Sequence, residues 1–398
     1  MILCQNTTFD HMIISQRLIQ FCLAIVLLFS CKSKENKEDD SVQISSEVSG
    51  IEVNYAKSFS IANHDDYSII YVYKPWPSAT KTYRYLVIDK ENLATITFPK
   101  DTYDAVITTP ISSIVATSTT HIPALESLGV LKALVGFPDT QYISSMPARE
   151  QIAKGEIREL GSNERLNTEM VISLNPDLIV GFAIDENNAP YEVLKKAKIP
   201  VIYNGDWTEE SPLGKAEWIK FFGVLFNKER KADSIFREIE QSYHSIQELA
   251  LQSNNLPTVL SGALYKDVWY APAGKSWAAQ FIRDANAKYI YESSDGTGSL
   301  SLGIESVLEK AQESDYWVAP AQFTTYDEME RTNEHYLQFK PFQKKKVFTF
   351  AATKGATGGL LYYELAPQRP DLVLKDLVHI FHPELLPNHT PYFFTPLK

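Results

Sequence analysis

The pattern of apolar and polar positions divides the chain beyond residue 51 into regions with different periods. The first region alternates β-branched and aromatic residues over short segments, with Pro75–Pro77 and Asp89 as breaks between them. This pattern predicts an opening antiparallel meander. Its strands are expected at Ser58–Ile61, Tyr67–Tyr73 and Thr82–Ile88.

A second region alternates short buried strands with amphipathic helices over short loops. The strands are expected at Ile111–Ala116, Leu134–Gly136, Leu178–Val180 and Pro200–Tyr203. The helices are expected at His121–Leu131, around Glu169 and at Tyr191–Ala197. Such alternation predicts a mostly parallel sheet that is covered on both faces, and hence an α/β fold.

Residues 212–251 form a third region, in which no strand pattern occurs. Apolar residues recur there at helical spacing, and Asn227 and Lys228 suggest a turn between two helices. The second helix is expected at Glu229–Leu251, or about 34 Å at ~1.5 Å per residue. A rod of this length could bridge two lobes; a long surface helix within one domain is the alternative.

After Pro257 the alternation of strands and helices returns. Strands are expected at Thr258–Leu260, Val268–Ala271, Tyr316–Ala319 and Lys346–Phe350, and helices at Trp277–Asp284, from Glu305 onward and at Pro370–Phe381. One helix–strand design, with an acid at the helix start, appears in Leu160–Phe182 and more faintly in Gly298–Pro320. The repeat predicts two α/β lobes with a ligand cleft between them. We expect an N-terminal lobe at 51–211, a helical linker at 212–252 and a C-terminal lobe at 253–398.

The start of the chain carries a targeting pattern. Arg17 precedes the short apolar run Leu18–Phe29, which is too short for a comfortable membrane span and typical of a secretory signal. The run leads into Leu28-Phe29-Ser30-Cys31, which resembles a bacterial lipobox. Residues 1–31 are therefore predicted to be a lipoprotein signal peptide, with Cys31 as the lipidated residue; a signal anchor is the alternative.

Residues 32–50 are charged and poor in apolar side chains, and they predict a disordered tether. The acidic run Glu38–Asp40 resembles the surface-export signal of some lipoproteins, although a plain solvated linker fits equally well. We expect a lipid-anchored protein of the bacterial cell envelope, at the periplasmic face or on the outer-membrane surface. The sequence allows translation to begin at Met1 or at Met12.

Composition narrows the class of protein further. A chain of 398 residues with 44% hydrophobic content is long enough for two domains. The net charge of −11 and the lack of a basic stripe argue against nucleic acid as a partner. All three cysteines, Cys4, Cys22 and Cys31, lie in the first 31 residues, so the body of the protein can use neither a disulfide nor a thiolate nucleophile.

Five segments are, in their order and spacing, similar to one protein family. They are Pro110–Leu131 with its Leu128-Gly129-Val130, Glu169–Val180 with its Asn175-Pro176-Asp177, Lys215–Gly223, Ala273–Trp277 and Pro370–Pro383. Over roughly residues 51–390 the chain resembles the periplasmic binding proteins that serve iron-complex and cobalamin ABC importers. The resemblance implies two α/β lobes joined by a long helix, as in class III substrate-binding proteins, with the ligand in the cleft and only small closure.

The resemblance also implies a role for Glu169 and Glu305. In the family, one surface glutamate per lobe docks onto arginines of the ABC permease, where a carboxylate accepts a bidentate contact. Glu169 lies seven residues before Pro176, as in the family pattern, whereas Glu313–Asp315 departs from that pattern after Glu305. Alternatively, both acids only favour the first turn of their helices; the two roles are compatible.

The family's ligands lie over loops at the carboxyl ends of strands. The equivalent loops are Thr117–His121, Pro138–Tyr142, Ser162–Arg165, Phe182–Asn188, Trp269–Trp277, Thr297–Ser301 and Phe323–Tyr326. Their aromatic and cationic side chains suit a large planar or anionic chelate. The residues expected to bind it are Tyr142, Asn163, Arg165, Trp269, Trp277, Phe323, Tyr326 and Lys354, with Arg149 and Lys275 as further cations. Core packing is the alternative for each aromatic residue, and Asn163 stands about where some relatives carry Arg or Trp, which leaves the ligand class open.

The expected function is capture of a metal chelate and its delivery to an ABC permease by a monomer. A ferric siderophore is the first candidate ligand, and cobalamin or haem is the alternative. The eight histidines are scattered, which argues against a direct metal site, and the usual catalytic motifs are missing, which argues against an enzyme. The Gly-rich run Lys354–Gly359 lacks the order of a phosphate loop and is expected to form a flexible rim of the cleft. We therefore expect no catalytic residue, no metal site and no cofactor.

Overall fold

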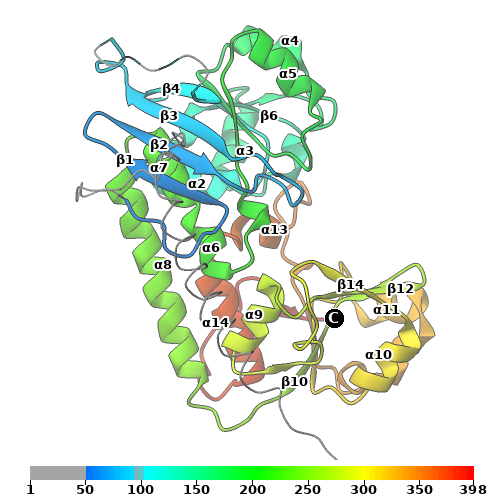
Figure 1. Ribbon diagram of the computed structural model, residues 1–398. Coiled ribbons are helices and arrows are strands. Elements are labelled where there is room, and N and C mark those ends of the chain that lie inside the picture. Colours follow the sequence, from blue (N-terminus) through cyan, green and yellow to red (C-terminus); the bar gives the residue numbers. More distant parts are fainter. Residues whose placement is uncertain (1–50, 95–96, 98, 100–101) are drawn as a thin grey trace, which may run out of the picture. The chain divides into compact units, whose positions relative to one another are not determined.

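The computed structural model describes residues 51–94, 97, 99 and 102–398 (Figure 1). The predicted signal peptide, Cys31 and the tether lie outside these residues. Two lobes, each with a mostly parallel sheet and its own helices, pack against the long helix α8 (Glu229–Ala250), as Figure 1 shows. The predicted α/β fold with two lobes joined by a long helix is confirmed.

The N-terminal lobe begins with a sheet of the order β1-β2-β3-β4, whose first three strands pair antiparallel. The strands are β1 (Phe59–Asn63), β2 (Tyr67–Val72), β3 (Tyr83–Asp89) and β4 (Ala105–Thr109). The predicted meander is therefore present. Strand β4, which pairs parallel with β3, is an addition that the sequence pattern did not indicate.

The second sheet of this lobe is fully parallel and has the order β7-β6-β5-β8-β9. Its strands are β5 (Ile114–Ala116), β6 (Leu134–Phe137), β7 (Arg158–Glu159), β8 (Leu178–Gly181) and β9 (Val201–Tyr203). The helical elements are α2 (His121–Leu128), η1 (Leu131–Ala133), η2 (Thr140–Tyr142), α3 (Met146–Ala153), α4 (Thr168–Leu174), α5 (Ala189–Lys196) and η3 (Asp206–Thr208). Helix α2 ends three residues before the predicted Leu131, because Gly129 adopts a left-handed conformation (φ 74°) and closes the helix.

The C-terminal lobe repeats this design. Its main sheet has the order β13-β10-β15-β16-β17 and is parallel except for the last pair, and β11, β12 and β14 form a small antiparallel sheet. The strands are β10 (Thr258–Ser261), β11 (Ala263–Tyr265), β12 (Val268–Pro272), β13 (Lys288–Tyr289), β14 (Ser299–Leu302), β15 (Tyr316–Val318), β16 (Val347–Thr349) and β17 (Thr395–Pro396). The helical elements are α9 (Trp277–Asp284), α10 (Ile304–Ala311), α11 (Tyr326–Thr332), η4 (Glu334–Gln338), α12 (Lys340–Gln343), α13 (Leu361–Leu365) and α14 (Pro370–Phe381).

Between the lobes, α6 (Pro212–Glu217) and α7 (Ile219–Leu225) precede α8. The predicted turn at Asn227 is present, with a left-handed φ of 51°. The stretch before that turn is broken at Trp218 into two short helices. Leu213 of α6 and half of α8 belong to the C-terminal core, whereas the other half of α8 belongs to the N-terminal core. Because the linker is shared in this way, the boundaries 51–211, 212–252 and 253–398 stay a prediction.

An aspartate just before a strand makes the same kind of contact in both lobes. Asp177 precedes β8, and its carboxylate accepts the backbone N–H groups of Ser112 and Ser113 at 2.9 Å each. Asp315 precedes β15 and accepts the backbone N–H and the hydroxyl of Thr258 at 3.0 and 2.8 Å. Asp177 lies eight residues after Glu169 and Asp315 ten residues after Glu305, so the second repeat holds its two extra residues before the aspartate. The bonds to Ser112 and Ser113 also explain why β5 begins three residues later than predicted, since these amides face a carboxylate and not a strand.

Glu364 in α13 carries a contact between the lobes. Its carboxylate accepts the backbone N–H groups of Ser144 and Ser145 at 2.6 and 2.9 Å, and the residue is 3% exposed. Burial raises the pKa of Glu364 to about 7, while the two hydrogen bonds lower it and the charge of Glu126 raises it. Ser145 also donates its hydroxyl to Glu126, so this one serine bonds to the carboxylates of both Glu364 and Glu126.

We expect Asp177→Ala to lower the free energy of unfolding by about 1–3 kcal/mol, because donors to a charged acceptor lose their partner. Partial burial acts to raise the pKa of Asp177, but the bonds from Ser112 and Ser113 lower it below the ordinary value of 3.8. The stabilisation is therefore complete above that value and is lost as the pH falls through the lower folded pKa. Urea unfolding at about pH 7 and about pH 2 measures the difference. Asp267→Ala, exposed in the β11–β12 turn, is the control; a cost for Asp177→Ala that persists unchanged in acid would contradict the assignment.

The raised pKa of Glu364 gives the opposite pH dependence. Between the ordinary value of 4.5 and about 7, the folded protein binds more protons than the unfolded chain, so stability should fall as the pH rises through this window. Glu364→Gln keeps an acceptor for one amide but does not titrate, so it should reduce the loss of stability with rising pH. Thermal unfolding midpoints between about pH 4.5 and about pH 8 test this, with Glu309→Gln, exposed on α10, as the control that keeps the wild-type slope. Equal slopes for the wild type and Glu364→Gln would refute it.

Candidate ligand-binding site

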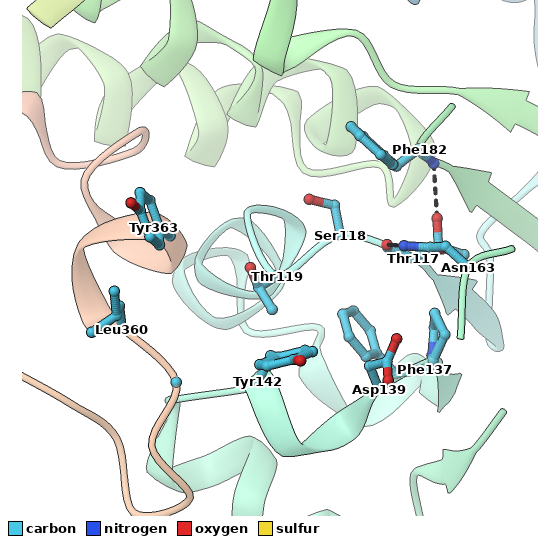
Figure 2. Close-up of a pocket in the computed structure, with 12 residues that line it drawn as sticks. Thr117, Ser118, Thr119, Phe137, Asp139, Tyr142, Asn163, Phe182, Leu360 and Tyr363 are labelled. Carbon is cyan, nitrogen blue, oxygen red and sulfur yellow. Dashed lines mark hydrogen bonds between the residues drawn. The ribbon is translucent and has the colours of Figure 1, made fainter. Parts of the chain in front are cut away.

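A hollow of about 320 Å³ lies between the two lobes, a volume at the lower end of the ~300–1,000 Å³ that is usual for small-molecule sites. Nine of its twelve lining residues come from the N-terminal lobe and three from the C-terminal lobe (Figure 2). They are Thr117, Ser118, Thr119, Phe137, Pro138, Asp139, Tyr142, Asn163, Phe182, Gly359, Leu360 and Tyr363. The hollow occupies the place where the sequence predicts a ligand cleft.

The parallel sheet of the N-terminal lobe brings the lining residues together. Thr117 follows β5, Phe137 ends β6 and Phe182 follows β8, so the hollow lies at the carboxyl edge of the sheet. Open α/β sheets place their ligands at this edge. The Thr117 hydroxyl accepts the backbone N–H of Phe182 at 2.8 Å, and Asn163 Nδ2 donates to the Thr117 carbonyl at 3.0 Å (Figure 2). These bonds hold three loops in one arrangement.

The Gly-rich segment 354–359 closes the hollow from the other lobe. The Thr357 hydroxyl donates to the Gln141 carbonyl at 2.6 Å, and the Ser144 hydroxyl donates to the Gly359 carbonyl at 3.1 Å. A Cβ at Gly359 would collide with the carbonyl oxygen of Tyr142, so glycine is what permits this approach. The segment forms a rim of the cleft, as the sequence predicts.

A second hollow of about 240 Å³ adjoins the first and shares Asn163 and Phe182 with it. It runs along residues 183–190, between β8 and the start of α5. The ring of Phe182 packs against Trp207 at 5.5 Å between centroids. The indole of Trp207 therefore lies against a residue that lines both hollows.

Two of the predicted ligand residues, Tyr142 and Asn163, line the hollow. Tyr142 is 57% exposed, and its ring projects into the hollow (Figure 2). Asn163 is fixed through its Nδ2 atom, but its buried Oδ1 atom has no hydrogen-bond partner among the described residues. This acceptor is enclosed by protein and is therefore not open to a ligand in the hollow.

The predicted cations lie outside both hollows. Arg165 and Lys354 are exposed, and neither lines a hollow. Arg149 donates to a backbone carbonyl at 2.6 Å, and Lys275 pairs with Asp295 at 2.8 Å on the surface. The expectation that such cations meet an anionic ligand in the cleft therefore finds no support in their positions.

For two predicted aromatic residues the structure gives a correction. Trp269 is fully buried, stacks on Trp317 at 5.2 Å, and donates its indole N–H to the Ser261 carbonyl. It is one of two buried residues of β12, with Ala271, so it belongs to the core. Tyr326 is also buried, and its hydroxyl accepts the backbone N–H of Val347 at 3.3 Å. Core packing, the stated alternative, holds for both.

Trp277 and Phe323 are half-buried and line neither hollow. Trp277 stacks on Tyr362 at 6.0 Å, and Phe323 packs against Tyr336 at 5.9 Å. The neighbour of Tyr362, Tyr363, is the aromatic residue that the C-terminal lobe supplies to the hollow. Its signal in the sequence was weak, because it lies inside a short helix after the Gly-rich segment.

Several lining residues come from loops that the sequence identified without singling out these side chains. Thr117, Ser118, Asp139 and Phe182 lie in the loops predicted to follow strands of the first lobe. The periodicity of the chain locates such loops, but it does not tell which side chain turns inward.

The candidate docking residues lie on the surface away from the hollow lining. Glu169 is the second residue of α4 and Glu305 the second residue of α10, and both are exposed. Met170 and Ile172 beside Glu169 are 37% and 43% exposed. An exposed carboxylate next to apolar side chains is compatible with a protein contact, in addition to the favourable place at a helix start.

The described residues contain no group of three or more His, Cys, Asp or Glu side chains placed to hold a metal ion. None of the helices in that part of the chain has the length and apolar character needed to cross a membrane.

Comparison with known proteins gives matches to binding proteins. The family profile described as periplasmic binding protein matches residues 114–353. An uncharacterized lipoprotein of Methanocaldococcus jannaschii is 26% identical over 300 residues, covering 73% of this chain and 69% of the relative. The structure of a possible iron-binding, periplasmic solute-binding protein from Staphylococcus epidermidis covers 69% of this chain and 100% of its own, with a TM-score of 0.54 and 19% identity. The periplasmic heme binding protein HutB of Vibrio cholerae covers 66% and 99%, with a TM-score of 0.52 and 17% identity.

The profile match spans more than half of the chain and extends from β5 to β16. It includes nine of the twelve residues that line the first hollow. Proteins of this family bind solutes and are not enzymes, in agreement with the expectation from the sequence. The chain belongs to the periplasmic binding protein family.

Proposed function

We propose that this protein is the substrate-binding lipoprotein of an ABC importer, which captures a ferric siderophore and delivers it to the permease. The observation that carries the proposal is the hollow between the lobes, at the carboxyl ends of β5, β6 and β8, in a chain of this family. The Staphylococcus relative, described as possibly iron-binding, supports an iron complex. The Vibrio relative, described as heme-binding, makes haem a competing ligand, and cobalamin is the other.

The chemistry of the lining suits a chelate with both apolar and polar parts. Tyr142 and Tyr363 line the hollow from different lobes, and Ser118 and Thr119 add hydroxyl groups to the lining (Figure 2). Aromatic rings provide contact area, and their hydroxyl groups provide hydrogen bonds at the same place.

Anchoring through a lipid on Cys31 would keep the protein in the cell envelope, at the periplasmic face or on the outer-membrane surface. The lipobox-like Leu28–Cys31 supports this placement, as does the description of a relative as a lipoprotein. One exposed glutamate near the start of a corresponding helix in each lobe supports docking of Glu169 and Glu305 onto a permease.

Ligand binding can be tested by calorimetry with a ferric trihydroxamate, a ferric tricatecholate, haem and cobalamin. We expect an iron chelate to bind, and Tyr142→Ala and Tyr363→Ala each to weaken its binding about tenfold, because a buried ring contributes on the order of 1–2 kcal/mol at an interface. Tyr265→Ala is the matched control, since Tyr265 is 66% exposed on β11 and lines neither hollow. Binding of haem or cobalamin alone would replace the iron chelate as the ligand, and binding of none of the four would overturn the proposal.

Docking can be tested apart from binding. Charge reversal in Glu169→Lys together with Glu305→Lys should abolish uptake of the labelled chelate in cells, because like charges would face the permease arginines. The affinity of the purified variant for the chelate should stay at the wild-type value. Glu309→Lys, on the same helix as Glu305, is the control and should transport normally. Undiminished uptake by the double variant would rule out this docking role.

A further inference from the structure

The charged side chains that line the two hollows are all acidic. Asp139 is the charged residue of the first hollow, and Glu164 and Asp185 are those of the second. None of the residues that line either hollow is a lysine, arginine or histidine. The hollows share Asn163 and Phe182, so a ligand in one feels the charges of both.

Asp139 directs its carboxylate into the first hollow. Its backbone is held in a left-handed conformation (φ 52°), where its N–H is shared between the Gly161 carbonyl at 2.6 Å and Glu159 Oε1 at 3.0 Å. Asp tolerates this conformation better than most residues. Its side chain makes no capping bond to η2, although it stands at the cap position, and Figure 2 shows it turned toward the hollow between Phe137 and Tyr142. The backbone is thus fixed while the carboxylate stays available to a ligand.

The surroundings of Asp139 lack a compensating cation. Burial raises the pKa of Asp139, and the negative charges of Glu159 and Glu164 raise it further. Arg149, the basic residue on the adjacent α3, keeps its charge, but its guanidinium donates to the Thr140 carbonyl at 2.6 Å, and no cation is among the described groups that shift the pKa of Asp139. A negative potential without a basic partner opposes anions and favours cations.

The neutral groups of the lining act in the same direction. The rings of Tyr142 and Tyr363 present electron-rich faces, which attract an ammonium group over a short range.

We propose that the cleft selects a chelate that carries a positively charged group, and that Asp139 is the residue that determines this selectivity. The inference deepens the proposed function and rests on it. An ammonium group on the ligand would pair with the Asp139 carboxylate in a charge-assisted hydrogen bond, whereas an anionic complex of the catecholate type would be repelled.

The test uses one iron-binding core with three different tails. The probes are the iron(III) complex of the linear trihydroxamate desferrioxamine B, which ends in an ammonium group, and its derivatives with that amine acetylated or succinylated. Calorimetry on the wild type should give the tightest binding for the ammonium form, about tenfold weaker binding for the acetylated form, equal to ~1.4 kcal/mol, and still weaker binding for the succinylated form. Asp139→Asn keeps the size of the side chain and should bring the three affinities to within about twofold of one another. Higher salt should reduce the preference of the wild type.

Asp267→Asn is the matched control, because it removes the same charge from an exposed turn outside both hollows. It should keep the wild-type order of affinities. If the wild type binds all three complexes equally, or if Asp139→Asn keeps the tenfold preference, the selectivity inference is wrong while the iron-chelate function stands. If none of the three binds but the ferric tricatecholate does, the inference is wrong and the iron-chelate function stands. If the tricatecholate does not bind either, both fail. The comparison of the three complexes on the wild type remains a valid test even if the Asp139→Asn variant does not fold.

Discussion

Helix α8 holds the two lobes in one arrangement, because a single apolar stripe on it belongs to both cores. Ala232, Phe236 and Ile239 pack into the core of the N-terminal lobe, and Tyr243, Ile246 and Ala250 pack into that of the C-terminal lobe. From Ala232 to Ala250 the stripe runs about 27 Å at ~1.5 Å per residue. A hinge inside this helix would break backbone hydrogen bonds and expose apolar surface at the same time. The helix is therefore a rigid support for the cleft, in line with the small closure that the family resemblance implies.

The second tie between the lobes lies beside the hollow itself. Glu364 accepts two amides from the other lobe, and Ser144, one of the two donors, also bonds to Gly359. Tyr142 and Tyr363, the two tyrosines that line the hollow, lie within two residues of these bonds. A ligand that moves either ring thus acts on the contact between the lobes.

The sequence predicted the elements whose period is long and regular, and it was less reliable where tertiary contacts decide. The predicted limits of α8 differ from the observed ones by one residue, and α14 is as predicted, because apolar periodicity over three or more turns is hard to mistake. Loops at the carboxyl ends of β5, β6 and β8 also lie at the hollow, as parallel topology requires. Trp269 was misassigned because a strand residue can face either way, and the local pattern does not tell which face meets the core. The positions of Asp139 and Tyr363 at the hollow depend on how the folded chain places the two lobes, which the sequence pattern does not show.

The chemistry of the hollow favours holding a ligand over transforming it. The Thr117 hydroxyl is already bonded to the Phe182 amide and to the Tyr191 hydroxyl, so it is a structural group and not a nucleophile. His121 follows the same loop, but burial lowers its pKa to about 4 and it does not line the hollow. Asp139 is the acidic residue of the lining, and its carboxylate makes no hydrogen bond to another lining residue within the described part of the chain. A lone carboxylate without a catalytic partner can orient a charged group but cannot relay a proton through a second residue. The same features that argue against catalysis thus make Asp139 a residue for recognition.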